Sequence, residues 1–419
     1  MKTAREVAEQ ALAGVLEGGG FSNLTLDKTL SSASLSPVDT AFCSALFYGV
    51  IERLKTIDYV LEAASGRAIP KIDPACRNHL RLGVLQILFM DKVPSSAAVN
   101  ETVKAVKKGK KPFLSGFCNA VLRKIDRERE AFLPPHDRLD LTYSCDAAFL
   151  NSLVTDYGME AAEAVLAHSL EPADTVIRLN PLRTDPASFA ASFPLTVTLK
   201  SDRCAILSGG NPVETDAFRQ GLFHVQGLGS QQAADAMEVK PGDRVLDTCS
   251  APGGKSFTMA ETMQNKGEII ACDLHEHRVK LIEKGAARLG LSIVHPCVAD
   301  ATKANEELGT FDRILCDVPC SGYGMIAEKP DMKYTDPAAF EELVPLQLTI
   351  LQKASAHLKE GGRLVYSTCT LRKAENEQVV AAFLKERKDF SLLSQKTYFP
   401  HLDGTSGFFV AVMERHSCG

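Results

Sequence analysis

"RVLDTCSAPGGKS" (residues 244–256) has the pattern of a buried strand, a turn of small residues and the start of a helix. Gly253 and Gly254 allow the backbone to approach a bound molecule closely, and the first helical turn offers unpaired amides. The spacing is neither that of a triphosphate-binding Walker loop nor G-x-G-x-x-G. The stretch therefore predicts a ligand site at a strand end, and it argues against a triphosphate and against a nicotinamide cofactor.

The strand-then-helix pattern repeats toward the end of the chain. Short, nearly continuous apolar runs follow in "GEIIACD", "SIVHPCVAD", "FDRILCDVPC" and "GRLVYSTC". Such runs suit parallel strands that are buried on both faces. Helical patterns occupy residues 254–264, 275–290, 336–358 and 373–387, and "FSLLSQ" with "GFFVAVMER" adds a closing hairpin. We predict an α/β fold with a Rossmann-like, doubly wound sheet of seven strands.

Four of these runs end in or near an acidic residue: Asp247, Asp273, Asp300 and Asp317. Each one alone is more simply explained as a cap of the next helix. Four in series are hard to attribute to chance, because ligands of open α/β sheets bind outside the carboxyl ends of the strands. Asp273 can accept hydrogen bonds from ribose hydroxyls, and Asp300 can meet an adenine amino group. A nucleoside cofactor without a phosphate anchor points to S-adenosylmethionine.

The chain before this region divides into two further parts. Residues 1–135 are predicted to form a helical domain, with helical patterns at 4–16, 37–64, 73–90 and 97–108. Residues 140–238 are predicted to form a small α+β connecting domain, with a helix at 147–169 and an extended stretch at 174–185. Residues 239–419 then form the catalytic domain.

Charge is distributed unevenly along the chain. The net charge is −5, yet residues 104–124 contain no acidic residue and seven basic ones. A solvated helix end and loop explain this run about as well as a surface that contacts nucleic acid phosphates. The candidate phosphate contacts are Lys107, Lys108, Lys110 and Lys111.

Composition narrows the class of protein. Apolar residues make up 45% of the chain and charged residues 24%, as in ordinary soluble proteins. There is no apolar run of roughly 20 residues and no signal-peptide core, so we expect a cytoplasmic protein without a membrane segment. The twelve cysteines are scattered without a pairing rhythm or zinc spacing, which favours reduced thiols and no metal. Without a heptad pattern, we expect a monomer.

Two cysteines differ from the others in their surroundings. Cys320, in "DVPCSG", and Cys369, in "STCT", lie on polar turns after the fourth and fifth strands of the predicted sheet. Neighbouring strands lie about 4.8 Å apart, so both thiols could face one substrate ring. A thiolate that adds to carbon 6 of a pyrimidine makes carbon 5 reactive enough to take a methyl group. That chemistry requires an unstacked or single-stranded base.

The motifs "DTCSAPGGKS", "DVPCSGYG", "EKPDMKY" and "YSTCTL" together resemble those of the Nop2/Sun (Fmu) RNA 5-methylcytosine methyltransferases. The helical N-terminus, with "YGVIERLKTIDYVL" and "GFCNAVLRK", is similar to the NusB-like domain fused to one member of that family. The resemblance spans nearly the whole chain. It implies methyl transfer from S-adenosylmethionine to carbon 5 of a cytosine in 16S (small-subunit) ribosomal RNA.

The resemblance also implies a role for each matching residue. Cys369 would attack carbon 6, Cys320 would assist release of the methylated RNA, and Asp317 would contact the cofactor or the cytosine amino group. Lys255 and Lys333 would lie beside the target nucleotide. The cofactor would be held by Asp273, Asp300 and the turn made of Cys249, Ser250, Ala251, Pro252, Gly253, Gly254 and Lys255.

Three other functions remain open at this point. The same chemistry could act on transfer RNA. A DNA cytosine methyltransferase would explain a Pro-Cys thiol at Cys320, but it would explain neither Cys369 nor the basic helical domain. A non-catalytic RNA-binding assembly factor is disfavoured by the intact pair of cysteines with Asp317 and Lys255. Since the chain has no tryptophan, RNA bases would have to stack on Tyr, Phe, His or Arg.

Overall fold

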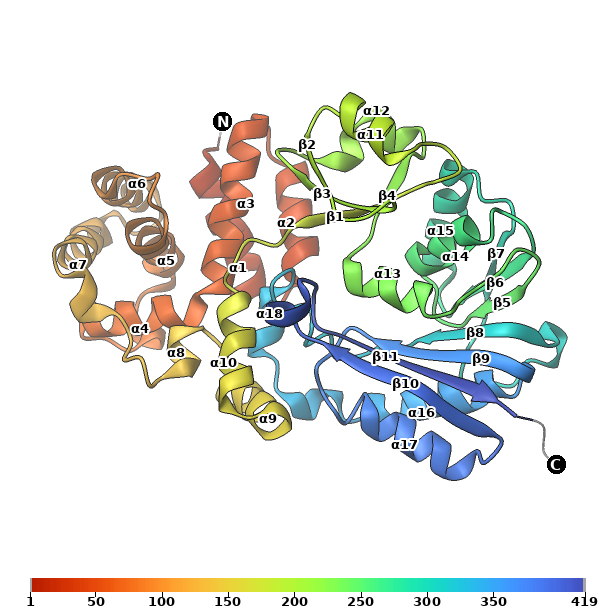
Figure 1. The fold of residues 1–419 in the computed structure, drawn as a ribbon. Helices are drawn as coiled ribbons and strands as arrows, with labels where there is room; N and C mark the ends of the chain where they lie inside the picture. Colours follow the sequence, from red (N-terminus) through yellow and green to blue (C-terminus); the bar gives the residue numbers. More distant parts are fainter. Residues whose placement is uncertain (1, 417–419) are drawn as a thin grey trace. The chain divides into compact units, whose positions relative to one another are not determined.

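The computed structural model describes residues 2–416 and divides into two compact units (Figure 1). Unit 1 comprises residues 1–151 together with 329–335, and unit 2 comprises 152–328 and 336–419, of which the structure describes residues up to 416. The division falls within helix α9 (Ala147–Tyr157). No helix among residues 2–416 is both long enough and apolar enough to cross a membrane.

Unit 1 is helical, as its apolar periodicity predicted. Its helices are α1 (Ala4–Leu16), α2 (Ser22–Ser31), α3 (Pro37–Glu52), α4 (Leu54–Ser65), α5 (Pro74–Phe89), α6 (Ser95–Lys108), α7 (Ser115–Arg127) and α8 (Leu139–Thr142). Local signals fix several starts: Thr3 and Glu6 form a capping box, and Ser36 and Asp73 cap helices that begin with proline. Leucine, valine and isoleucine side chains on the inner faces of these helices form one apolar core.

The predicted helix at 37–64 is interrupted at Arg53, whose φ of −118° and ψ of 23° separate α3 from α4. The free backbone groups at this break bind side chains. The Tyr334 hydroxyl donates to the carbonyl of Ile51 (2.6 Å) and accepts from the amide of Leu54 (3.3 Å). Segment 329–335, far away in sequence, is thus built into the helical unit.

After the second half of α9, unit 2 continues with α10 (Met159–His168) and a small four-stranded sheet in the order β2-β3-β1-β4. The strands are β1 (Thr175–Leu179), β2 (Thr196–Leu199), β3 (Cys204–Ser208) and β4 (Phe223–Val225), with α11 (Pro186–Ser192) and α12 (Asp216–Arg219) between them. The single helix predicted at 147–169 is instead two helices, because Gly158 takes a φ of +82° and ends α9.

The large sheet has seven strands in the order β10-β11-β9-β8-β5-β6-β7, which confirms the predicted fold. Strands β5 to β9 run parallel, and β10 and β11 form the predicted antiparallel hairpin. The strands are β5 (Arg244–Asp247), β6 (Glu268–Asp273), β7 (Val294–Val298), β8 (Phe311–Asp317), β9 (Leu358–Thr368), β10 (Phe390–Tyr398) and β11 (Phe408–Arg415). Helices α13 (Leu228–Asp235), α14 (Gly254–Thr262), α15 (Glu276–Leu289), α16 (Leu343–Ser355), α17 (Glu377–Glu386) and α18 (Pro400–Asp403) complete the unit.

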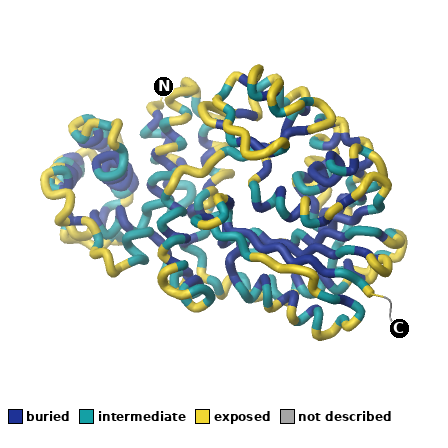
Figure 2. The backbone as a smooth tube through the Cα atoms, viewed as in Figure 1, coloured by how far each residue is buried: buried dark blue, intermediate teal, exposed yellow. Residues whose placement is uncertain are grey.

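Helices cover both faces of the sheet (Figure 1), and its central strands are largely buried (Figure 2). Alternate residues of these strands enter two separate cores, one on each face. Leu315 and Val365 pack on the side of α14 and α15, whereas Ile314 and Leu364 pack on the side of α16 and α17. Each buried aliphatic side chain contributes about 1.5–3 kcal/mol. This burial holds the strands in register, and it thereby fixes which strand ends are neighbours.

Candidate active site

A cavity of about 360 Å³ opens at the carboxyl ends of the parallel strands. It gathers residues from the carboxyl ends of all five parallel strands, β5 to β9, as is typical of ligand sites in open α/β sheets. Seven of the predicted site residues line it: Cys249, Ala251, Asp273, Asp300, Asp317, Cys320 and Cys369. The remaining lining groups include Leu274, His275, Arg278, Leu346 and Ile350.

The turn after β5 contributes Cys249 and Ala251 to the wall of this cavity, whereas Ser250, Pro252, Gly253 and Gly254 do not line it. Gly253 has a φ of +110°, and a Cβ there would lie 2.3 Å from the ring of Phe257, so only glycine fits. Helix α14 begins at the next residue. Below the turn, the Ser256 hydroxyl donates to Asp247 (2.7 Å) and lies 2.9 Å from the Ser250 hydroxyl. The turn is therefore held from beneath by buried hydrogen bonds.

Asp247 belongs to that support and does not line the cavity. Its side chain is fully buried, and its second carboxyl oxygen lacks a hydrogen-bond partner among the described residues. Burial raises the pKa of Asp247 to about 7, against the stabilising hydrogen bond from Ser256. Of the four acidic residues that the sequence singled out, three thus face the cavity and one supports its floor.

The two acidic residues on the cofactor side are held in different ways. Asp273 accepts from the amide of His275 (3.1 Å) and forms an ion pair with Arg278 (3.4 Å). Asp300 accepts from the Thr302 hydroxyl (2.6 Å), which is the first cause of its lowered pKa. Both carboxylates present oxygen atoms at the cavity that can accept hydrogen bonds, as binding to ribose hydroxyls or an adenine amino group requires.

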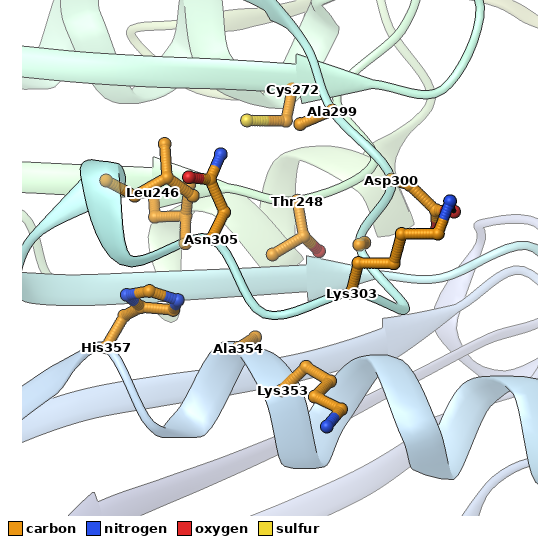
Figure 3. Close-up of a pocket in the computed structure, with 12 residues that line it drawn as sticks. Leu246, Thr248, Cys272, Ala299, Asp300, Lys303, Asn305, Lys353, Ala354 and His357 are labelled. Carbon is orange, nitrogen blue, oxygen red and sulfur yellow. Dashed lines mark ion pairs between the residues drawn. The ribbon is translucent and has the colours of Figure 1, made fainter.

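A second, smaller pocket of about 30 Å³ adjoins the first behind Asp300 (Figure 3). It shares Thr248, Ala299 and Asp300 with the larger cavity, and Lys303 lies 3.1 Å from the Asp300 carboxylate. A space of this size holds about one or two water molecules. The smaller pocket therefore extends the cavity wall and cannot hold a nucleoside.

Asp317 lies between the cofactor side and the thiols. Its carboxylate accepts from the ammonium of Lys255 (2.7 Å) and from the hydroxyl of Ser367 (2.7 Å). The Lys255 ammonium also lies 5.2 Å from the ring centre of Phe408. Lys255 does not line the cavity; it fixes the orientation of Asp317, which does.

The two cysteines at the end of β8 and β9 lie side by side. Strands β8 and β9 pair in parallel with Asp317 opposite Ser367, which confirms that the predicted fourth and fifth strands are neighbours. The two sulfur atoms, Cys320 Sγ and Cys369 Sγ, are 3.2 Å apart, and both thiols are half-buried at the cavity wall. The eleven cysteines of residues 2–416 carry free thiols, and the twelfth, Cys418, lies outside the described residues.

The contact between these thiols makes them chemically unequal. The hydrogen bond that Cys320 makes with Cys369, together with burial, raises the pKa of the Cys320 thiol well above its usual range. A thiol that keeps its proton can donate it to the neighbouring sulfur. The pair can thus present one thiol and one stabilised thiolate to a substrate ring.

The other predicted substrate contacts lie in unit 1. Lys333 is fully buried, and its ammonium donates to the carbonyls of Glu52 (3.0 Å) and Tyr143 (3.1 Å). These contacts anchor segment 329–335 in the helical unit, and the place beside the target nucleotide that the family resemblance implies for Lys333 stays a prediction. Burial lowers the pKa of Lys333 to about 8.

The predicted basic run lies on the surface of unit 1, at the end of α6 and in the loop that follows. Lys107, Lys108, Lys110 and Lys111 are all exposed. Lys111 forms an ion pair with Asp73 (2.6 Å), whereas no carboxylate in the described part of the chain pairs with the other three. Phe113, next in the loop, is 77% exposed.

Comparison with known proteins assigns both parts of the chain to families. The model of the 16S rRNA methyltransferase RsmB/F family matches residues 234–414, and that of the NusB family matches residues 2–127. The probable ribosomal RNA small subunit methyltransferase B of Bacillus subtilis (strain 168) is 36% identical over 99% of each chain. The corresponding protein of Synechocystis sp. (strain PCC 6803) is 31% identical over 99% of this chain and 100% of its own.

Solved structures agree with the fold. The crystal structure of a protein named PH0851 superposes with a TM-score of 0.81 at 26% identity and covers 99% of both chains. The structure of NSun6 from Pyrococcus horikoshii with SFG has a TM-score of 0.60 at 22% identity. It covers 65% of this chain and 98% of its own.

Proposed function

Because the chain belongs to the RsmB/F family of 16S ribosomal RNA methyltransferases, we propose that it methylates carbon 5 of a cytosine through a covalent cysteine adduct. The observation that carries this proposal is the pair of sulfur atoms 3.2 Å apart in the same cavity as Asp273 and Asp300. One set of groups suits a nucleoside cofactor, and the other suits a reaction that needs a nucleophilic thiolate.

S-adenosylmethionine is the methyl donor of this family, and it supplies an electrophilic methyl group. The residues present fit its nucleoside part. Asp273 offers acceptors for ribose hydroxyls, Asp300 offers one for an adenine amino group, and Leu274, Leu346 and Ile350 supply apolar walls. The cavity of about 360 Å³ lies within the range of small-molecule sites.

The protein's own residues then divide the work on the base. Cys369, as the thiolate, adds to carbon 6, and electron density moves to carbon 5. Asp317, oriented by Lys255 and Ser367, accepts a hydrogen bond from the cytosine amino group and holds the ring. After carbon 5 carries the methyl group, a base removes the carbon 5 proton and the carbon–sulfur bond breaks. Cys320, beside that bond, assists release of Cys369 and the methylated RNA.

The three predicted parts of the chain correspond to three tasks in this proposal. Residues 1–135 bind RNA, residues 140–238 connect, and residues 239–419 carry out the reaction. Lys107, Lys108 and Lys110 would contact phosphates, and the exposed ring of Phe113 would stack on an unpaired base. Replacing all three lysines with alanine should make the slope of log RNA affinity against log salt concentration less steep, by the amount expected for the loss of about two to three phosphate contacts. Filter binding at several salt concentrations measures this slope.

The adduct provides the direct test. Native protein, Cys369→Ala and Cys320→Ala are mixed with 16S ribosomal RNA and labelled S-adenosylmethionine, and covalent complexes are counted on a denaturing gel. Cys369→Ala should form no adduct and no product, whereas Cys320→Ala should accumulate adduct. The opposite pattern would contradict the assignment. Cys297→Ala is the matched control, because this half-buried thiol of the same sheet does not line the cavity.

The substrate is tested separately with the native protein. Equal amounts of purified 16S ribosomal RNA and total transfer RNA are methylated, and 5-methylcytosine is measured by mass spectrometry of the digested nucleosides. We expect incorporation into 16S RNA. Exclusive incorporation into transfer RNA would replace the substrate but keep the chemistry, and absence of cofactor binding in calorimetry would remove both.

A further inference from the structure

Outside the cavity, a buried polar cluster joins the two turns that carry the thiols. Ser321 and Thr370 directly follow Cys320 and Cys369, and their hydroxyl oxygens are 2.7 Å apart. Both side chains are buried, and neither lines the cavity. This hydrogen bond joins the residues that follow the two cysteines, and it fixes one turn against the other. The backbone of the two turns therefore sets the distance between the sulfur atoms.

Glu375 holds the Cys320 turn from below. Its carboxylate is fully buried, and Oε2 accepts from the amide of Ser321 (2.9 Å) and from the Gln347 side-chain amide (2.9 Å). The same Gln347 nitrogen donates to the carbonyl of Pro319 (2.9 Å). The residues immediately before and after Cys320 are therefore both connected to this carboxylate.

Asn376, the next residue, holds the Cys369 turn in the same manner. Its side-chain amide donates to the carbonyl of Thr370 (2.9 Å), and its oxygen accepts from the Thr368 hydroxyl (2.6 Å). The residues on both sides of Cys369 are thus bound to one buried asparagine. Two adjacent residues in sequence each fix one of the two cysteines.

Charge distinguishes the two sides of this cluster. Arg372 donates to Glu375 (3.2 Å) and to Glu341 (2.7 Å), so two carboxylates share a single cation and leave a net negative charge. The hydrogen bond to Cys369 and burial are the larger causes of the raised pKa of Cys320, and the charge of the Glu375 carboxylate raises it further. The Tyr366 hydroxyl donates to the Glu375 carbonyl (2.6 Å). On the cavity side, apart from the two thiols themselves, the charged or titratable groups are Cys249, Asp273, His275, Arg278, Asp300 and Asp317.

We propose that Glu375 and Asn376 are positioning residues for the thiol pair, and that the Glu375 carboxylate keeps the proton on Cys320 so that Cys369 is the thiolate. The division of labour between two chemically identical side chains then follows from an uncharged amide behind one and a carboxylate behind the other. Its consequence for turnover rests on the proposed function, whereas its consequence for thiol reactivity does not.

The test measures Cys320 in isolation. In the full-length Cys369→Ala protein, alkylation of Cys320 by iodoacetamide is followed between pH 6 and 11 by peptide mass spectrometry, with and without Glu375→Gln. We expect Glu375→Gln to lower the pH midpoint of alkylation by one unit or more. A purely structural role would change the rate or the melting temperature without moving the midpoint, and an unchanged midpoint would overturn the electrostatic part.

Two further variants complete the test. Glu341→Gln removes an exposed carboxylate of the same cluster, and because water screens that charge it should move the midpoint much less than Glu375→Gln does. Asn376→Ala should slow adduct formation by Cys369 at least tenfold without moving the Cys320 midpoint; an unchanged adduct rate would overturn the positioning part. If Glu375→Gln does not fold, Gln347→Leu replaces it: the loss of this donor leaves the Glu375 charge less neutralised, so the midpoint should rise, and an unchanged or lowered midpoint would overturn the electrostatic part.

These outcomes separate this inference from the proposed function. The midpoint shift needs no RNA, so it stands or fails even if the protein methylates no RNA offered to it. A protein that forms 5-methylcytosine but shows no shift retains its function and loses this inference.

Discussion

Two of the cysteine pairs that are in contact among residues 2–416 lie in opposite surroundings. Cys320 and Cys369 end two strands at a cavity, with hydroxyls, a carboxylate and amides around them. Cys76 and Cys118 are in hydrogen-bonding contact in the apolar core of unit 1, where both are fully buried. A pair of contacting cysteine thiols can therefore form a reactive centre or part of an apolar core. The presence of a polar network around the thiols distinguishes the two cases.

The largest expected effect breaks the pair at the cavity. Cys369→Ala should lower turnover by at least about a thousandfold, because loss of a covalent nucleophile removes the route itself. Cys118→Ala should leave turnover within about twofold, since its thiol lies in the helical core. Single-turnover methylation of 16S RNA at saturating cofactor measures both. Comparable losses in the two variants would show that sulfur chemistry is not confined to the cavity.

A second change sharpens the role of the polar edge without removing a thiol. Asp317→Asn keeps the shape of the side chain but loses its charge toward Lys255, and we expect kcat/KM to fall by about a hundredfold. Asp312→Asn is the matched control, because Asp312 pairs with Lys359 near the amino end of the same strand. Equal effects at the two ends of β8 would contradict a special role for the carboxyl end.

The third prediction concerns the stability of the polar edge. Folding raises the pKa of Asp247 from 3.8 to about 7, so the stability it contributes is complete below pH 4 and is lost as the pH rises through 7. Relative to Asp247→Asn, the native protein should lose up to about 1.4 kcal/mol of unfolding free energy per pH unit across that window. Urea unfolding without cofactor at several pH values measures the difference.

Asp300→Asn gives the opposite sign in the same experiment. The pKa of Asp300 is lowered by the Thr302 hydroxyl, so its contribution is present above its ordinary value and is lost as the pH falls. Parallel pH profiles for the two variants would contradict the assignment of Asp247 as a buried acid that holds a proton.

The smallest expected effect is in the helical core. Cys118→Ala should lower the free energy of unfolding by about 1–2 kcal/mol, because packing is lost and because Cys76 loses its hydrogen-bond partner. Cys76→Ala and the double variant complete a mutant cycle read by thermal unfolding. Additive effects would show that the contact between the two sulfurs contributes nothing of its own.

Sequence reasoning found what the period of apolar residues can fix. The seven-stranded sheet, its closing hairpin and the adjacency of Cys320 and Cys369 all follow from strand order and burial. It missed the groups that complete the site through long-range contacts. Gln347 contacts Pro319, which lies 28 positions away in the sequence, and Glu375 contacts Ser321, which lies 54 positions away. Only the folded chain brings these residues together. No local pattern carries that information.

Lys333 shows the same limit from the other direction. Its motif suggested a place beside the nucleotide, but a lysine in a loop after β8 can lie wherever that loop leads. The structure leads it into the helical unit, where backbone carbonyls of Glu52 and Tyr143 hold its ammonium. Burial depends on tertiary partners, and the residue type alone does not determine it.

The placement of segment 329–335 also sets an order on biosynthesis. The first 151 residues leave the ribosome early, yet the segment that caps the break between α3 and α4 follows about 180 residues later, roughly ten to forty seconds at ordinary rates of translation. Until then, the amide of Leu54 cannot bind the Tyr334 hydroxyl, and the carbonyl of Glu52 cannot bind the Lys333 ammonium. The break between α3 and α4 can therefore form its final hydrogen bonds only after Tyr334 has been synthesised.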